Sequence, residues 1–311
     1  MPGLRSPGRS LLDFLLRVSW PGSMFCYCIF SALLFASLPS SIFAQDGGSR
    51  EDGSERQDPA QLVREVVQNE IQTQLHDDSL WCFREQKEQD SQATKTLQVC
   101  GTQDGDLERL VAVNGREISP AEMQAEDQRI KKLVAHPAQL RANQKKQHED
   151  AEQLRSLMKA LPEAFHFQYS AVEGHLIKLS FRPNHAFRPS TRATLVFHHV
   201  EGSMVIDQEQ KRIAEISGRI TSEVKFVGGL LGHLDKGGTF LVKAGQVASG
   251  HWDVLLMNLD ISGRALFFKT ISVHEKEMYG DYTRVPAGAA LEQVAQLLSK
   301  ECNNLRTAST R

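Results

Sequence analysis

The sequence predicts an α+β fold built on one strongly curved antiparallel sheet, an open half-barrel of about ten strands with covering helices. Three observations predict it. From Pro162 onward the chain is mostly alternating or wholly apolar runs joined by short turns, which is typical of antiparallel strands. Amphipathic segments stand at the start, middle and end. The predicted strands 251–262 and 265–273 are apolar on both faces, so each side of the sheet needs a cover.

Residues 1–44 form a targeting segment. Three arginines precede the apolar run 24–38, and a small residue, Ala44, follows at the expected cleavage point. We expect a signal peptide cleaved after about Ala44, with an uncleaved anchor as the alternative; translation could start at Met1 or Met24. The run is shorter than the roughly 20 apolar residues that span a membrane. After cleavage, the protein is expected to be periplasmic and not an integral membrane protein.

Residues 45–58 are rich in glycine, serine and charge, and are expected to be a disordered linker. A helix should begin after Asp58, which is a typical N-cap and is followed by Pro59. Apolar residues then recur every four positions to Leu75, so one face of this helix should pack against the rest of the protein.

The cysteines of the mature chain suggest one disulfide bond. The segments 79–88 and 94–102 read as a hairpin centred on Ser91, which places Cys82 directly opposite Cys100. Because an exported protein meets an oxidising compartment, we expect a bond between them, with two free thiols as the alternative. Cys302 is left unpaired.

A helical insertion is predicted at 119–160, beginning at a capping box formed by Ser119 and Glu122. Its stretch 139–153 is polar all round and is expected to be an exposed helical arm.

The remaining chain should complete the sheet. Its predicted strands include 193–206 and the meander 238–248, 251–262 and 265–278, with turns at Ser249-Gly250 and Ser262-Gly263. A short helix at 289–301 ends a single domain spanning 59–301, and residues 302–311 are expected to be a flexible tail.

Composition and motifs argue against several functions. The 311 residues carry a formal charge of −2, and the basic leader leaves the body more acidic still, so nucleic acid is not an expected partner. No hydrolase, metalloprotease or nucleotide-binding motif is present, and we expect neither an enzyme nor a cofactor. An exported hydrolase with a non-standard site built on His198 or His233 is the remaining alternative. The adjacent His198 and His199 are interpreted as strand neighbours that point to opposite faces, so no metal site is predicted.

The glycine-rich loop 225–239 is either a lid that contacts a ligand or a wide connection between strands. Its leucines would form an apolar tip. A phosphate-binding P-loop needs glycines at a fixed spacing before its lysine. The glycines around Lys236 do not have this spacing, so the loop is not a P-loop.

The order of elements resembles the periplasmic lipoprotein carriers LolA and LolB and the N-terminal domain of RseB. The segments FRPNHAFRPS, FHHVEGSMVIDQEQKRIAEISGRI, VKFVGGLLGHLDKGGTF and GRALFFKTISV are also similar to a family of uncharacterised exported bacterial proteins, over about residues 59–279. The carrier resemblance implies a curved, unclosed barrel whose concave face holds acyl chains.

We therefore expect a non-enzymatic periplasmic binding protein that carries or senses acyl chains or lipoproteins. The ligand-binding residues expected for it are Phe226, Leu230, Leu231 and Trp252. The alternative is an envelope structural or interaction protein that binds a protein partner through the arm 139–153.

Overall fold

The computed structural model describes residues 57–90, 92–229, 231–265 and 269–299. The predicted signal peptide, nearly all of the linker and the tail lie outside these residues, as does Leu230.

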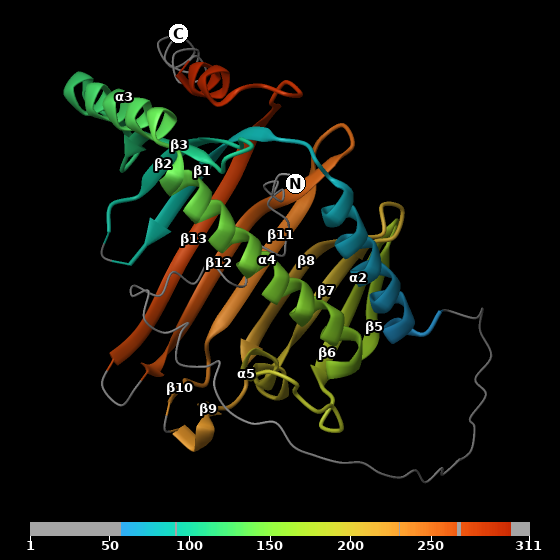
Figure 1. The fold of residues 1–311 in the computed structure, drawn as a ribbon. Coiled ribbons are helices and arrows are strands. Elements are labelled where there is room, and N and C mark those ends of the chain that lie inside the picture. Colours follow the sequence, from blue (N-terminus) through green and yellow to red (C-terminus); the bar gives the residue numbers. More distant parts are fainter. Residues whose placement is uncertain (1–56, 91, 230, 266–268, 300–311) are drawn as a thin grey trace, which may run out of the picture.

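The described residues form one open antiparallel sheet of 13 strands (Figure 1). Its order is β4-β3-β2-β1-β13-β12-β11-β8-β7-β6-β5, and the short β9 and β10 attach to it through β12. The strands are β1 (Trp81–Gln89), β2 (Lys95–Cys100), β3 (Leu107–Val113), β4 (Arg116–Glu117), β5 (Phe165–Glu173), β6 (Leu176–Pro183), β7 (Val200–Asp207), β8 (Arg212–Ile220), β9 (Val224–Phe226), β10 (Gly232–Leu234), β11 (Thr239–Ala248), β12 (His251–Ala265) and β13 (Lys269–Arg284). The α+β class and the antiparallel sheet are thus confirmed, while the prediction of about ten strands was too low. The additional strands are β4, β9 and β10, which are too short to give a period-two pattern.

Two of the helices, α2 (Pro59–His76) and α3 (Pro120–Ala135), begin at the capping residues that the sequence indicates. The others are α4 (Ala138–Ala164) and α5 (Arg192–Leu195), the 3-10 helices η1 (Val196–His199) and η2 (Val227–Gly229), and a helix at 291–299. The Asp58 carboxylate accepts a hydrogen bond from the backbone of Gln61, and Ser119 and Glu122 form a complete capping box. Each cap satisfies a backbone donor that the first helical turn leaves free.

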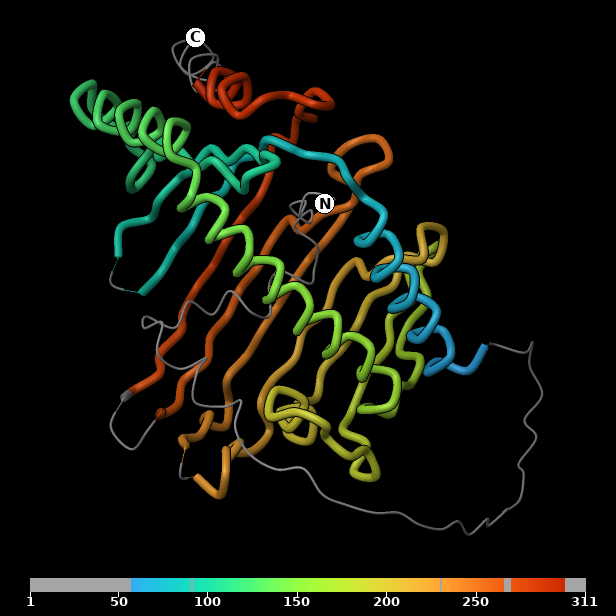
Figure 2. The backbone as a smooth tube through the Cα atoms, in the orientation of Figure 1, coloured from blue at the N-terminus to red at the C-terminus, as the bar shows by residue number. Residues whose placement is uncertain are grey.

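Two helices lie across one face of the sheet, called the inner face below. The backbone trace in Figure 2 shows α4 running diagonally across the sheet, with α2 beside it over the β5–β8 side. Both helices bury apolar residues, among them Val63 on α2 and Leu154 on α4, in one core with Leu179, Met204 and Met257 of the sheet. Removing this apolar area from water is the main source of stability for this part of the fold.

A second core lies around the disulfide bond. Cys82 and Cys100 are bonded, and β1 pairs with β2 in the predicted register, including Phe83 opposite Val99. The bonded cysteines pack in a cluster with Leu107, with α3 and α4 residues, and with Val294 from the helix at 291–299. The disulfide prediction is confirmed.

The predicted strand 193–206 is wrong in its first half. Thr191 and Thr194 form a capping box that begins α5, and helical turns continue through His199 before β7 starts at Val200. The physical reason is that a single helical turn shows too little periodicity to be distinguished from an apolar strand. His198 and His199 are consequently not strand neighbours.

The predicted turn at Ser262-Gly263 is also wrong, because β12 continues through both residues. Ser262 pairs with Ser272, and β10 pairs with β12 at Gly263. A Cβ atom at Gly263 would lie 2.3 Å from the carbonyl oxygen of His233. The glycine is therefore explained by the close approach of another strand and not by a turn.

The predicted arm 139–153 is the first half of α4, and only part of it is exposed. Leu140, Gln144 and Ala151 are buried. Gln144 donates a hydrogen bond to the carbonyl oxygen of Gln103, in the loop between β2 and β3. The helix also carries on to Ala164, with Pro162 inside it, beyond the predicted end at 160.

Candidate functional site

Four groups of residues are candidates for a functional site: an apolar part of the inner face, a hollow in the sheet, and two clusters of buried charges. They are described in this order.

The apolar part lies on β11, β12 and β13. Phe240, Trp252, Ile261 and Val273 contact the main core and are only partly buried. By contrast, the equivalent positions on β6 and β7, where α2 and α4 lie, are almost fully buried, as Leu179 shows. On β11 and β12 the inner face thus carries partly accessible apolar side chains among fully buried ones such as Val242, Met257 and Leu259.

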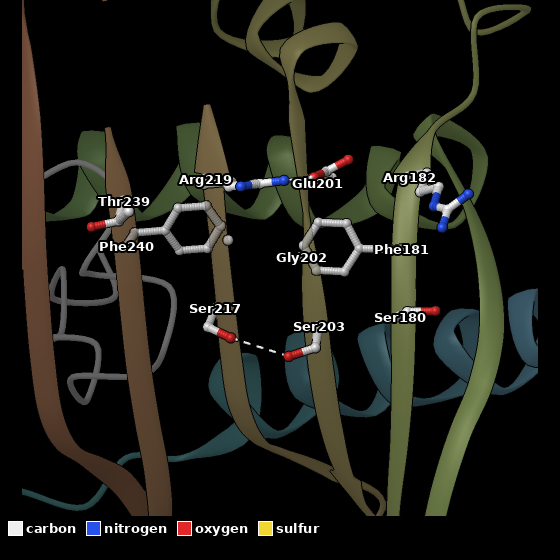
Figure 3. A pocket seen from close by; sticks show the side chains of 11 residues that line it. Ser180, Phe181, Arg182, Glu201, Gly202, Ser203, Ser217, Arg219, Thr239 and Phe240 are labelled. Atoms are coloured by element: carbon white, nitrogen blue, oxygen red, sulfur yellow. Dashed lines mark hydrogen bonds and ion pairs between the residues drawn. The ribbon is translucent and has the colours of Figure 1, made fainter. Parts of the chain in front are cut away.

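The hollow lies across β6, β7, β8 and β11 and has a volume of about 670 Å³ (Figure 3). At its centre, Gly202 pairs with Gly218 on the neighbouring strand. The rings of Phe181 and Phe240 point toward this glycine pair from either side. A Cβ at Gly202 would lie 1.9 Å from the carbonyl oxygen of Ser217, so the two strands can approach this closely only without side chains.

Polar groups line the hollow on the face opposite the helices. Ser203 and Ser217 share a hydrogen bond of 3.1 Å between their hydroxyl oxygens. Arg219 forms an ion pair of 2.7 Å with Glu201. Arg182, at the end of β6, is exposed and completes this rim. The hollow can hold a polar group, but its lining residues do not combine a nucleophile with a base and acid arranged for catalysis.

The first buried charged cluster lies where β1 meets β13. Lys87 forms ion pairs with Glu275 and Glu277, and the Tyr279 hydroxyl donates to Glu277. Both carboxylates are almost completely buried.

The two carboxyl groups of this cluster have opposite pKa shifts. Burial, together with the hydrogen bond to Glu277, raises the pKa of Glu275 despite the nearby ammonium of Lys87. Burial also opposes ionisation of Glu277, but its hydrogen bonds and the ammonium outweigh this and lower its pKa. The cluster therefore holds its negative charge on Glu277.

The second cluster joins the end of α2 to β1 and β12. His251 lies between two carboxylates, with its Nδ1 3.6 Å from Asp77 and its Nε2 3.4 Å from Asp253. Its ring stacks on Trp81 at 4.1 Å between centroids. Ser79 donates to Asp77, which orients that carboxylate.

The carboxylates keep this histidine charged. Burial alone would lower the pKa of His251, but the hydrogen bonds and charges of Asp253 and Asp77 outweigh it and raise the pKa to about 9. Burial would likewise raise the pKa of Asp77, yet His251 and Ser79 lower it to about 2. At neutral pH the imidazolium has no free lone pair for general-base chemistry, which favours a structural role for this cluster.

The predicted ligand residues do not form one site. Phe226 and Leu231 lie together, since the Leu231 backbone donates a hydrogen bond to the Phe226 carbonyl oxygen. Trp252 lies near the start of β12, whereas β10, which holds the loop 225–239 to the sheet, pairs with the last residues of that strand. An extended strand rises about 3.3 Å per residue, so roughly 35–40 Å of β12 lies between Trp252 and the residues that pair with β10.

Sequence reasoning missed both charged clusters. Their members are far apart in the chain, as with Lys87 and Glu277, and no local motif joins them. The one available signal was the placement of charged residues at inward positions of strands that are otherwise apolar. His76 is the last residue of α2, where its ring contacts the carbonyl oxygen of Gln72.

Searches for metal clusters and membrane spans gave negative results within the described part of the chain. No group of three histidine, cysteine or acidic side chains there is arranged to hold a metal ion. None of the helices in that part is long and apolar enough to cross a membrane. Comparisons with protein-family models and with curated proteins find no match for this chain.

Proposed function

We propose that this is a non-enzymatic periplasmic binding protein that carries or senses acyl chains or lipoproteins on the inner face of an open half-barrel. The observation that carries the proposal is the row of partly accessible apolar side chains formed by Phe240, Ile261 and Val273 on β11–β13, which packs against the core under α2 and α4; Trp252 lies apart from it near the start of β12. Burying an acyl chain there would be favourable by about 0.8 kcal/mol per methylene group.

The border of this row suits an amphiphile. Met257 pairs with Glu277 and Leu259 with Glu275, so apolar residues of β12 lie directly beside the charged cluster of β13. An acyl chain could contact β11 and β12 while its polar head lies toward Lys87. This arrangement supports an amphiphilic ligand over a purely apolar one.

The test is the uptake of a fluorescent fatty-acyl probe by the purified, delipidated protein. Val273→Glu places a charge in the apolar row and should reduce probe affinity at least tenfold, because a carboxylate would have to be buried beside the chain. Val172→Glu is the matched control, since Val172 is 47% exposed at the end of β5. Equal affinity in both variants would contradict the proposal.

Absence of uptake by the unaltered protein would favour the alternative, an envelope interaction protein that uses the arm 139–153. In that case, charge reversal on the solvent-facing side of the arm, at Lys145 and Lys146, should abolish capture of a protein partner without changing stability.

A further inference from the structure

The loop between β6 and β7 carries an excess of positive charge. Residues 182–199 include three arginines, Arg182, Arg188 and Arg192, and three histidines, but no acidic residue. All three arginines are exposed, and among the residues that the structure describes no carboxylate forms an ion pair with them. Their charges are therefore available to an external partner. The Arg188 guanidinium donates a hydrogen bond to the carbonyl oxygen of His185, which orients it without neutralising it.

This loop is held in a defined position by a chain of ring contacts that connects it to the core. Phe197 contacts Phe165 of β5 at 5.2 Å between centroids, and Phe187 contacts Phe197 at 6.4 Å. Phe187 in turn contacts His198, whose ring stacks at 6.1 Å on that of His185. The arginines are thus presented by an ordered loop.

The arginines carry the positive charge of the loop. Burial lowers the pKa of His199, and repulsion from His198 and His185 lowers it further, so the neutral form of His199 is favoured.

An exposed apolar residue lies at the same end of the sheet. Figure 1 shows α5 and the β9–β10 hairpin at the lower end of the view. The residues just before this hairpin contact η1, because the backbone of Thr221 and the hydroxyl of Ser222 bond to His199. Val227, between β9 and β10, is 54% exposed and has a positive φ of 53°. A β-branched residue rarely adopts this conformation, so the hairpin fixes an apolar side chain in water.

We propose that this end of the molecule, made of residues 182–199 and Val227 and called the basic end below, docks on a membrane surface that contains anionic phospholipid. Arginines would contact the phosphate groups, while Val227 and the edge of Phe187 would enter the interface. A soluble acidic partner would use the charges alone, whereas the fixed exposed valine favours a lipid surface. Docking does not require an acyl-binding site and stands apart from the proposed function.

The test is sedimentation with vesicles of phosphatidylcholine, with and without phosphatidylglycerol. Binding should require phosphatidylglycerol and weaken at high salt, because salt screens exposed charges. Each arginine near an anionic surface contributes about fivefold to affinity, so the triple variant Arg182→Gln, Arg188→Gln, Arg192→Gln should bind about a hundredfold more weakly.

Two controls separate this surface from general effects. The triple variant Arg64→Gln, Arg116→Gln, Arg284→Gln removes the same charge from exposed sites elsewhere and should change binding no more than a few fold. Val227→Asp should weaken binding about tenfold. Val172→Asp should not weaken binding, because Val172 lies at the end of β5 that is away from the basic end.

Three results would overturn the proposal: no binding of the unaltered protein to phosphatidylglycerol vesicles, equal losses in the two arginine variants, or equally tight binding to soluble polyglutamate. Loss of acyl-probe uptake with vesicle binding intact would remove only the proposed function.

Discussion

Charged side chains are buried and paired at one end of the sheet, whereas at the other end they are exposed to water. Where α2 meets β1 and β12, His251 is buried between Asp77 and Asp253. At the basic end, Arg188 and Arg192 face water and have no carboxylate partner among the described residues. The difference follows from solvation: a buried charge must be paired, whereas water stabilises an exposed charge without one. Hence we expect the first end to contribute to stability, and we propose the second for recognition.

The largest effect on stability is expected from removal of the buried cation. His251→Ala removes the cation that lies between Asp77 and Asp253, and it should lower the free energy of unfolding by about 3–5 kcal/mol. Urea denaturation measures this value. A loss below about 1 kcal/mol would mean that the two carboxylates do not depend on the imidazolium.

A pH titration of stability should give the next largest effect. Because the pKa of His251 in the folded protein is about 9, above its ordinary 6.5, its stabilising contribution is complete below pH 6.5 and is lost as the pH rises through about 9. The loss should reach at most about 3 kcal/mol.

At acidic pH, Asp77 should make the stability depend on pH in the opposite sense. Its pKa is lowered from 3.8 to about 2, so its contribution is present above 3.8 and disappears as the pH falls through about 2. Denaturation curves of the unaltered protein and of His251→Ala, taken side by side, isolate these contributions. If the two proteins lose stability in parallel on the alkaline side, other groups are responsible.

Close packing near the basic end should produce an intermediate effect. Gly202→Ala would place a Cβ 1.9 Å from the carbonyl oxygen of Ser217, and we expect a loss of about 1–3 kcal/mol. Gly280→Ala is the control, since no atom lies within 4 Å of the position that its methyl group would occupy and its φ is ordinary for a non-glycine residue. Thermal unfolding compares the two, and equal stabilities would show that the strands of the hollow can separate freely.

The smallest effect is expected at the exposed arginines. Arg188→Gln with Arg192→Gln should change the free energy of unfolding by less than about 0.5 kcal/mol, because these surface arginines form no ion pair with the residues that the structure describes. Urea denaturation beside His251→Ala provides the comparison. A loss of several kcal/mol would place these arginines among the structural charges.

Local rules are sufficient where interacting residues lie close in the chain. The caps at Asp58 and Ser119 and the bond between Cys82 and Cys100 depend on segments of fewer than about twenty-five residues, and each follows from the sequence. The same rules are wrong at Gly263, where the cause is a strand that is distant in sequence. They are also wrong at 193–199, where a single helical turn resembles an apolar strand.

The candidate sites are harder to predict from the sequence, because their residues are also distant from one another in the chain. Phe226 and Leu231 lie together because one loop contains both, but Trp252 lies at the opposite end of β12 from that loop. The basic end could have been found from the run of residues 182–199 without acids. Its apolar partner, Val227, is brought to it only by the contacts of His199 with Thr221 and Ser222.

By itself, the sequence determined the class of the fold, the ends of its first helices and the pairing of its cysteines, because periodicity, capping and short-range register are local. Only the tertiary structure decided which charges are buried and which are free. It brought His251 to Asp77 across 174 positions and left the arginines of the β6–β7 loop in water. Burial depends on every segment that packs nearby, and no single segment of the sequence contains that information.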